Sequence, residues 1–148
     1  MNKYRNLLLA VLALALLSDS CTEKEVLRPK ETAERLLSGI DRKDWLMESF
    51  DIDGASQNLG LCDSSYVLTL FSDKTWEENY LSFACFSLRF GIWEVNEEGN
   101  VLKNTLYNYN LRRWEVYHYE ILSLTEDSFT YRQVIFRNRF KTVVLRKG

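Results

Sequence analysis

Three cysteines and one histidine carry the most reactive side chains of this 148-residue sequence. Thiolates and imidazole nitrogens can bind zinc, but a structural zinc site needs four such ligands. Cys62, Cys85 and His118 are isolated from one another in the sequence, and no pair of further ligands accompanies them. We therefore expect no metal site and no cofactor.

Catalytic motifs are also missing from the sequence. It contains no Gly-x-Ser-x-Gly elbow, no phosphate-binding loop and no His-Glu-x-x-His motif. His118 lies between two tyrosines and has no evident partner for acid–base catalysis. The run 51–54, Asp-Ile-Asp-Gly, lacks the spacing and the closing glutamate of a calcium-binding loop, which favours a turn. We expect a protein that is not an enzyme.

The N-terminus has the pattern of a secretory signal peptide. Lys3 and Arg5 precede an uninterrupted apolar run at 7–17, and small residues follow it. A transmembrane helix needs about 20 apolar residues, so this run is too short to be one. Residues 1–20 are therefore predicted to be removed on export.

Ser20-Cys21, directly after the apolar run, resembles a bacterial lipobox. The resemblance implies that Cys21 is lipidated and becomes the first residue of the mature chain, with residues 21–28 as a polar tether. Two acyl chains anchor a protein stably. We expect a protein of the cell envelope that is held by its lipid at the outer membrane, on the periplasmic face or at the cell surface.

Cys62 and Cys85 are then the remaining cysteines of an exported chain, and exported proteins form disulfides. The two residues are equally distant in sequence from the centre of an expected hairpin with its turn at 72–74. An unbroken hairpin would place them opposite each other. We predict a disulfide bond between them, with two buried free thiols as the alternative.

The elements that must position these residues are mostly strands. Pro29 followed by residues 30–38 predicts a short helix that ends at Gly39. From residue 44 onward, β-rich runs alternate with turn residues. Eight strands are expected, at 45–51, 66–71, 75–80, 87–95, 101–107, 114–124, 129–136 and 140–145. No long helix separates them, so the sheet should be an antiparallel meander. Such strands close most economically into a barrel, and a two-sheet sandwich is the alternative.

Aromatic residues make up 14% of the chain, and most of them fall on these strands. In an eight-stranded barrel they either fill the interior or line a cavity for one small ligand. The candidate cavity residues are Trp45, Phe71, Trp76, Phe90, Trp93, Trp114, Tyr117 and Tyr119. We expect binding of a small apolar or amphipathic ligand. A filled barrel that acts as an interaction or assembly subunit of the cell envelope is the alternative, and a glycan-binding surface is a further one.

The formal net charge is −2, which argues against a nucleic-acid-binding protein. The charges are unevenly distributed, because six basic residues and no acidic residue follow Asp127. Arg132, Arg137, Arg139 and Lys141 are candidate contacts for an anionic partner such as lipid head groups or an acidic polymer. The alternative is a solvated strand edge that is protected by its charge.

Several motifs together resemble the lipocalin-like domain of small lipoproteins in Gram-negative bacteria. They are Trp45, Cys62-Asp63, the hairpin at 70–75, Cys85, Gly91-Ile92-Trp93-Glu94 and the run 121–129. Gly91-Ile92-Trp93 is similar to the glycine-any-tryptophan signature of lipocalin-type barrels. The resemblance implies an all-β domain at 29–148, an antiparallel eight-stranded up-and-down barrel with a short N-terminal helix. It implies no particular activity, because one architecture hosts unrelated functions.

Overall fold

The computed structural model describes residues 27–85 and 88–148. The predicted signal peptide, Cys21 and the tether up to residue 26 lie outside the described residues. The elements are α2 (Pro29–Ser38), β1 (Arg42–Ile52), β2 (Ala55–Ser56), α3 (Leu61–Ser64), β3 (Tyr66–Phe71), β4 (Thr75–Tyr80), η1 (Phe83–Cys85), β5 (Arg89–Val95), β6 (Val101–Asn108), β7 (Arg113–Leu124), β8 (Ser128–Ile135), η2 (Phe136–Asn138) and β9 (Arg139–Lys147).

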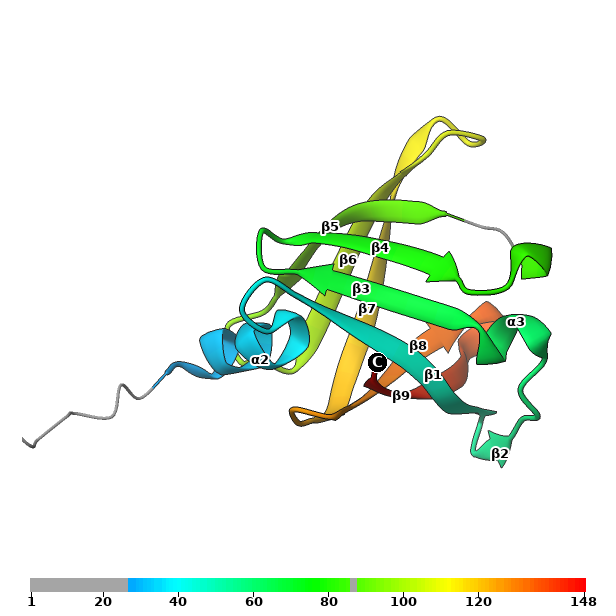
Figure 1. Cartoon of the computed structure of the whole chain (residues 1–148), viewed down its shortest axis with the longest axis horizontal. Coiled ribbons are helices and arrows are strands. Elements are labelled where there is room, and N and C mark those ends of the chain that lie inside the picture. Colours follow the sequence, from blue (N-terminus) through cyan, green and yellow to red (C-terminus); the bar gives the residue numbers. More distant parts are fainter. Residues whose placement is uncertain (1–26, 86–87) are drawn as a thin grey trace, which may run out of the picture.

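The strands form a closed antiparallel barrel (Figure 1). Each of β3 to β9 pairs with its neighbour in sequence, and β1 pairs with both β3 and β9, which closes the ring. The short β2 pairs only with β1 within the described part of the chain. The predicted eight-stranded up-and-down barrel is confirmed, and the sandwich alternative is wrong.

The predicted element bounds agree closely with the observed ones. The helix at 29–38 and the strands at 66–71 and 75–80 are confirmed without change, and the other strands differ by one to three residues at their ends. Ser87, the expected first residue of the fifth strand, lies outside the described residues. The sequence interpretation missed β2, α3, η1 and η2, because elements of two to four residues are too short to show a periodicity.

Helix α2 covers one end of the barrel, the closed end (Figure 1). Pro29 occupies the first turn, and Gly39 ends the helix with a positive φ of 66°. The buried ammonium of Lys43 on β1 donates to the carbonyl oxygen of Leu36 at 2.6 Å. These contacts satisfy helix carbonyls that would otherwise lack a donor.

The core lies inside the barrel next to α2. Trp45 and Phe129 are fully buried there, with their ring centroids 5.7 Å apart in an edge-to-face arrangement. Further buried side chains surround them: Leu37, Leu70, Trp93, Val95, Leu102, Val143 and Leu145. Large side chains therefore fill the closed half of the barrel. The opposite, open end carries the disulfide-bonded loops and the projecting β6–β7 hairpin (Figure 1).

Candidate functional site

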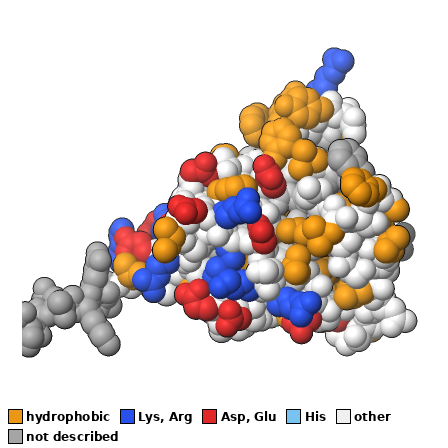
Figure 2. Space-filling view, in the orientation of Figure 1, with side chains coloured by type: hydrophobic (Ala, Val, Ile, Leu, Met, Phe, Trp, Pro, Cys, Tyr) orange, Lys and Arg blue, Asp and Glu red, His pale blue; other side chains and the backbone are white. Residues whose placement is uncertain are grey.

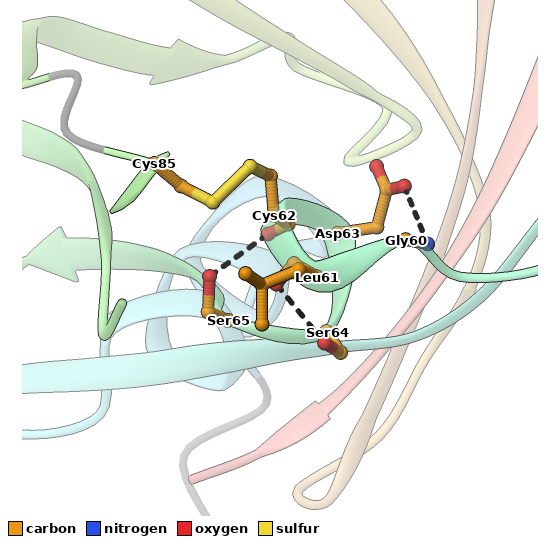
Figure 3. The surroundings of a disulfide bond; sticks show 7 residues. All are labelled: Gly60, Leu61, Cys62, Asp63, Ser64, Ser65 and Cys85. Atoms are coloured by element: carbon orange, nitrogen blue, oxygen red, sulfur yellow. Dashed lines mark hydrogen bonds between the residues drawn. A yellow bond between two sulfur atoms is a disulfide. The ribbon is translucent and has the colours of Figure 1, made fainter. Parts of the chain in front are cut away.

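A disulfide bond joins Cys62 to Cys85 at the open end (Figure 3). Their Cα atoms are 5.3 Å apart, and the bond connects α3, before β3, to η1, before β5. The single turn of α3 is held by local hydrogen bonds, such as that from the Gly60 amide to the Asp63 carboxylate at 3.1 Å. The predicted pairing is formed, and it ties η1 to α3.

The four tryptophans predicted to line a cavity lie in different places. Trp45, Trp76 and Trp93 are buried in the core. The indole nitrogens of Trp76 and Trp93 donate to the carbonyl oxygens of Ile92 and Phe71, at 3.1 and 3.0 Å. These three side chains therefore fill the barrel and fasten its strands together. Phe71 itself is half-buried at the end of β3.

A small chamber lies deeper in the barrel, between the core and the open end. Its volume is about 10 Å³, roughly enough for one water molecule. The lining residues are Tyr66, Leu68, Glu78, Leu102, Asn104, Tyr119, Phe129 and Tyr131. Burial raises the pKa of the phenols of Tyr66, Tyr119 and Tyr131, which are therefore neutral at ordinary pH. With this volume, the chamber is too small for an organic ligand.

A polar network occupies the open end. Arg89 on β5 donates through Nη2 to the hydroxyl of Tyr117 at 3.1 Å, and Tyr117 donates to Glu115 at 2.8 Å. Hydrogen bonds from Asn108, Tyr117 and Arg113 lower the pKa of Glu115, the bond from Asn108 having the largest effect. The open end therefore presents ionised and hydrogen-bonding groups.

A groove opens where β5 and β6 separate. The two strands pair from Val95↔Leu102 to Ile92↔Thr105, and their remaining residues, 89–91 and 106–108, are not paired with each other. Gly91 lies at the point of separation, where a Cβ atom would be 2.0 Å from the carbonyl oxygen of Thr105. Glycine is required there because the backbones approach so closely. Beyond this point the groove has a volume of about 610 Å³.

Apolar and aromatic side chains line most of this groove. Phe90 and Trp114 are 56% and 66% exposed, and the ring centroid of Tyr107 lies 5.0 Å from that of Tyr109 and 5.4 Å from that of Trp114. Leu88, Ile92 and Leu106 are further apolar lining residues. Figure 2 shows the hydrophobic side chains gathered on the projecting β6–β7 hairpin. The apolar side chains of β5, β6 and the start of β7 therefore form one wall of the groove.

The eight predicted cavity residues thus do not line one cavity. Trp45, Trp76 and Trp93 belong to the core, and Tyr117 and Tyr119 pack against it. Phe90 and Trp114 line the groove, Tyr119 borders the chamber, and Tyr117 belongs to the polar network. The sequence interpretation missed Leu88, Ile92, Tyr107 and Tyr109 as groove residues. No local pattern reveals that β5 and β6 separate, because each reads as an ordinary strand.

The basic residues of the last hairpin contact other strands. Arg132 forms an ion pair with Glu120 at 2.6 Å, and Arg139 forms one with Asp53 at 2.6 Å. The ammonium of Lys141 lies 4.4 Å from the centre of the Phe50 ring. The side chain of Arg137 lies outside the described part of the structure. These ion pairs neutralise part of the positive charge that was predicted to contact an anionic partner.

Two further findings concern residues 27–85 and 88–148, one about metal ligands and one about membrane-spanning helices. No group of three or more His, Cys, Asp or Glu side chains is placed there to hold a metal ion. None of the helices there has the length and apolar character needed to cross a bilayer.

Comparison with known proteins gives a fold relationship. No protein-family model matches the sequence, and no curated protein matches it. Among solved structures, the chain is similar to a lipocalin-like protein from Bacteroides uniformis, with 14% sequence identity and a TM-score of 0.55. The match covers 76% of this chain and 99% of that one. The chain therefore has a lipocalin-like fold.

Proposed function

We propose that this protein is a lipid-anchored binding module of the bacterial cell envelope that holds a small apolar or amphipathic ligand in the groove between β5 and β6. The observation that carries the proposal is the apolar groove of about 610 Å³ at the open end. Small-molecule sites typically have volumes of about 300–1,000 Å³ and mostly apolar or aromatic walls. The lipocalin-like fold is consistent with a binding role.

Exposed rings support the location of the site. Phe90, Tyr109 and Trp114 keep most of their surface in water although they border the same groove. Contiguous exposed apolar surface on a soluble domain usually marks a binding site. A ligand in the groove would remove this surface from water, with a gain of roughly 25 cal/mol per Å² buried.

The anchor and the groove would lie at opposite ends of the barrel. The described chain begins at Leu27, directly before α2, and α2 covers the closed end. If Cys21 carries the lipid, the closed end is the one nearest to the membrane. The groove would then open away from the anchoring membrane, toward ligands in the surrounding compartment.

Titration with N-phenyl-1-naphthylamine, a neutral dye that fluoresces in apolar surroundings, tests the proposal on the purified protein. We expect saturable binding that Phe90→Ala and Trp114→Ala each weaken about tenfold, because each removes a large apolar contact. Leu122→Ala is the matched control, since Leu122 is an exposed apolar residue of β7 outside the groove. Absence of saturable binding, or equal affinity in all variants, would refute the proposal.

The filled interior favours a second candidate function, an interaction or assembly subunit at the cell envelope. The chamber among the buried tyrosines measures about 10 Å³, which is too small for an organic ligand. In that case the exposed aromatic surface would contact a protein. Chemical crosslinking in intact cells distinguishes the two, because Trp114→Ala should then abolish a defined crosslinked species and leave dye binding unaffected.

A further inference from the structure

We propose that the ligand of this groove is an anionic amphiphile whose charged end binds Arg89 and whose apolar tail lies against Phe90 and Trp114. This inference rests on the proposed function, because it assigns the ligand class of the same site. It is carried by the charge of the groove, the free hydrogen-bonding capacity of Arg89 and the position of that side chain.

Arg89 is the one charged side chain among the described residues that line the groove. The other lining side chains are apolar, aromatic or neutral polar ones: Thr75, Leu88, Phe90, Ile92, Leu106, Tyr107, Asn108, Tyr109, Asn110 and Trp114. Electrostatic attraction is stronger beside apolar walls than in open water. A single cation in such a groove therefore favours a ligand with one negative charge and discriminates against a cationic one.

The guanidinium of Arg89 has donors to spare. Of its five N–H groups, the one on Nη2 donates to Tyr117 at 3.1 Å. Its Nη1 also forms an ion pair with the Glu78 carboxylate at 3.6 Å, a separation longer than a good hydrogen bond. An arginine in this state can bind a carboxylate, sulfate or phosphate oxygen pair with two parallel hydrogen bonds.

The neighbouring carboxylates are held by other donors. Glu78 accepts a hydrogen bond from the hydroxyl of Tyr66 at 3.3 Å, and Glu115 accepts bonds from Asn108 at 3.1 Å and Tyr117 at 2.8 Å. These partners let both carboxylates keep their places when a ligand anion takes up the remaining donors of Arg89. When Arg89 binds the ligand, Glu78 and Glu115 therefore each keep a hydrogen-bond donor.

Arg89 also lies at the position that orients an amphiphile. It belongs to the part of β5 that pairs with β4 but not with β6. Because side chains alternate along a strand, its guanidinium points to the inner face, 5.3 Å from the centre of the Tyr117 ring on β7, while Phe90 faces outward. The charged end of a ligand would thus sit where the groove meets the open end of the barrel. Its tail would extend along the aromatic wall formed by Phe90 and Trp114.

Three probes with the same tail and different heads test this inference: dodecanoate, dodecan-1-ol and dodecyltrimethylammonium, each below its micelle concentration. Each is measured by displacement of N-phenyl-1-naphthylamine. We expect dodecanoate to bind about tenfold more tightly than the alcohol, with the cation weakest, because a carboxylate accepts charge-assisted hydrogen bonds from Arg89 that are stronger than those to a hydroxyl. Arg89→Gln should bring dodecanoate to the affinity of the alcohol and leave alcohol binding unchanged, and Arg89→Lys should keep part of the preference.

Arg112→Gln is the matched control, because Arg112 is an exposed arginine of the β6–β7 turn that does not line the groove. If the alcohol binds and dodecanoate shows no preference, the inference about Arg89 is overturned and the proposed function stands. If Arg112→Gln weakens dodecanoate as much as Arg89→Gln does, general charge attraction explains the preference and the inference is again overturned. If none of the three probes binds, the proposed function itself fails.

Discussion

The indole Nε1 of Trp45 donates a hydrogen bond of 2.8 Å to the carbonyl oxygen of Leu37, and both side chains are fully buried. Leu37 lies in the last turn of α2, whose carbonyls have no partner within the helix. One side chain of β1 therefore both fills the core and fastens the helix across the closed end. Lys43, two residues earlier on the same face, does the same for Leu36.

Replacement of Trp45 by phenylalanine should lower the free energy of unfolding by about 1–3 kcal/mol. Trp45→Phe keeps an aromatic ring but leaves the buried Leu37 carbonyl without its donor. Urea denaturation followed by circular dichroism measures the loss. Trp114→Phe is the control, because Trp114 is exposed and should change stability by less than about 0.5 kcal/mol. Equal losses in the two variants would contradict this assignment.

Gly91→Ala should destabilise the barrel by about 3 kcal/mol. The new Cβ atom would meet the Thr105 carbonyl oxygen at 2.0 Å and the indole nitrogen of Trp76 at 2.9 Å, so β5 must shift away from β6. Thermal unfolding measures the effect. Gly60→Ala is the control, since its Cβ would lie 3.3 Å from the flexible Asp63 carboxylate. Equal melting temperatures of the two variants would show that the backbone approach of Gly91 to Thr105 does not require glycine.

The features that could be predicted from the sequence depend on local signals. The hairpin of β3 and β4 was predicted with its observed bounds, because a polar turn at 72–74 separates two β-rich runs. The disulfide followed from the symmetric placement of Cys62 and Cys85 about that turn. Each of these inferences needs only residues that are close in sequence.

The groove could not be predicted, because it depends on a long-range relationship. Pairing of β5 with β6 stops at Ile92↔Thr105, and no periodicity in either strand marks that point. Parity along β5 also left open which face points inward, so exposed Phe90 and buried Trp93 were assigned to one cavity. In the same way, the ion pair of Arg132 with Glu120 follows from the register of β7 and β8.

The enclosed tyrosines predict a stability that declines in alkali. Burial raises the pKa of Tyr66, Tyr119 and Tyr131 in the folded state, while unfolding returns each phenol to a pKa of about 10. Above pH 10 the unfolded chain releases protons that the folded chain retains, so the free energy of unfolding falls as the pH rises. The slope approaches about 1.4 kcal/mol per pH unit for each phenol.

Denaturation midpoints between pH 8 and pH 12, together with tyrosinate absorbance, measure this decline. The buried phenols should ionise together with unfolding. Tyr131→Phe should reduce the slope by about one third, because it removes one of the three phenols. Tyr109→Phe is the control, since Tyr109 is exposed and its replacement removes no buried phenol. Ionisation of all tyrosines in the folded protein near pH 10 would contradict the prediction.

Removal of the disulfide should affect both stability and the groove. The bond closes a loop with a sequence separation of 23, so Cys62→Ser combined with Cys85→Ser should lower the free energy of unfolding by about 3 kcal/mol. Leu88 and Phe90, which line the groove, follow Cys85 closely in sequence. Without the disulfide, the dye would have to order this part of the groove wall when it binds. That ordering costs free energy, so dye affinity should also fall. Dithiothreitol treatment of the unmodified protein should reproduce both effects. If stability falls and dye affinity is unchanged, the disulfide stabilises the fold without organising the groove.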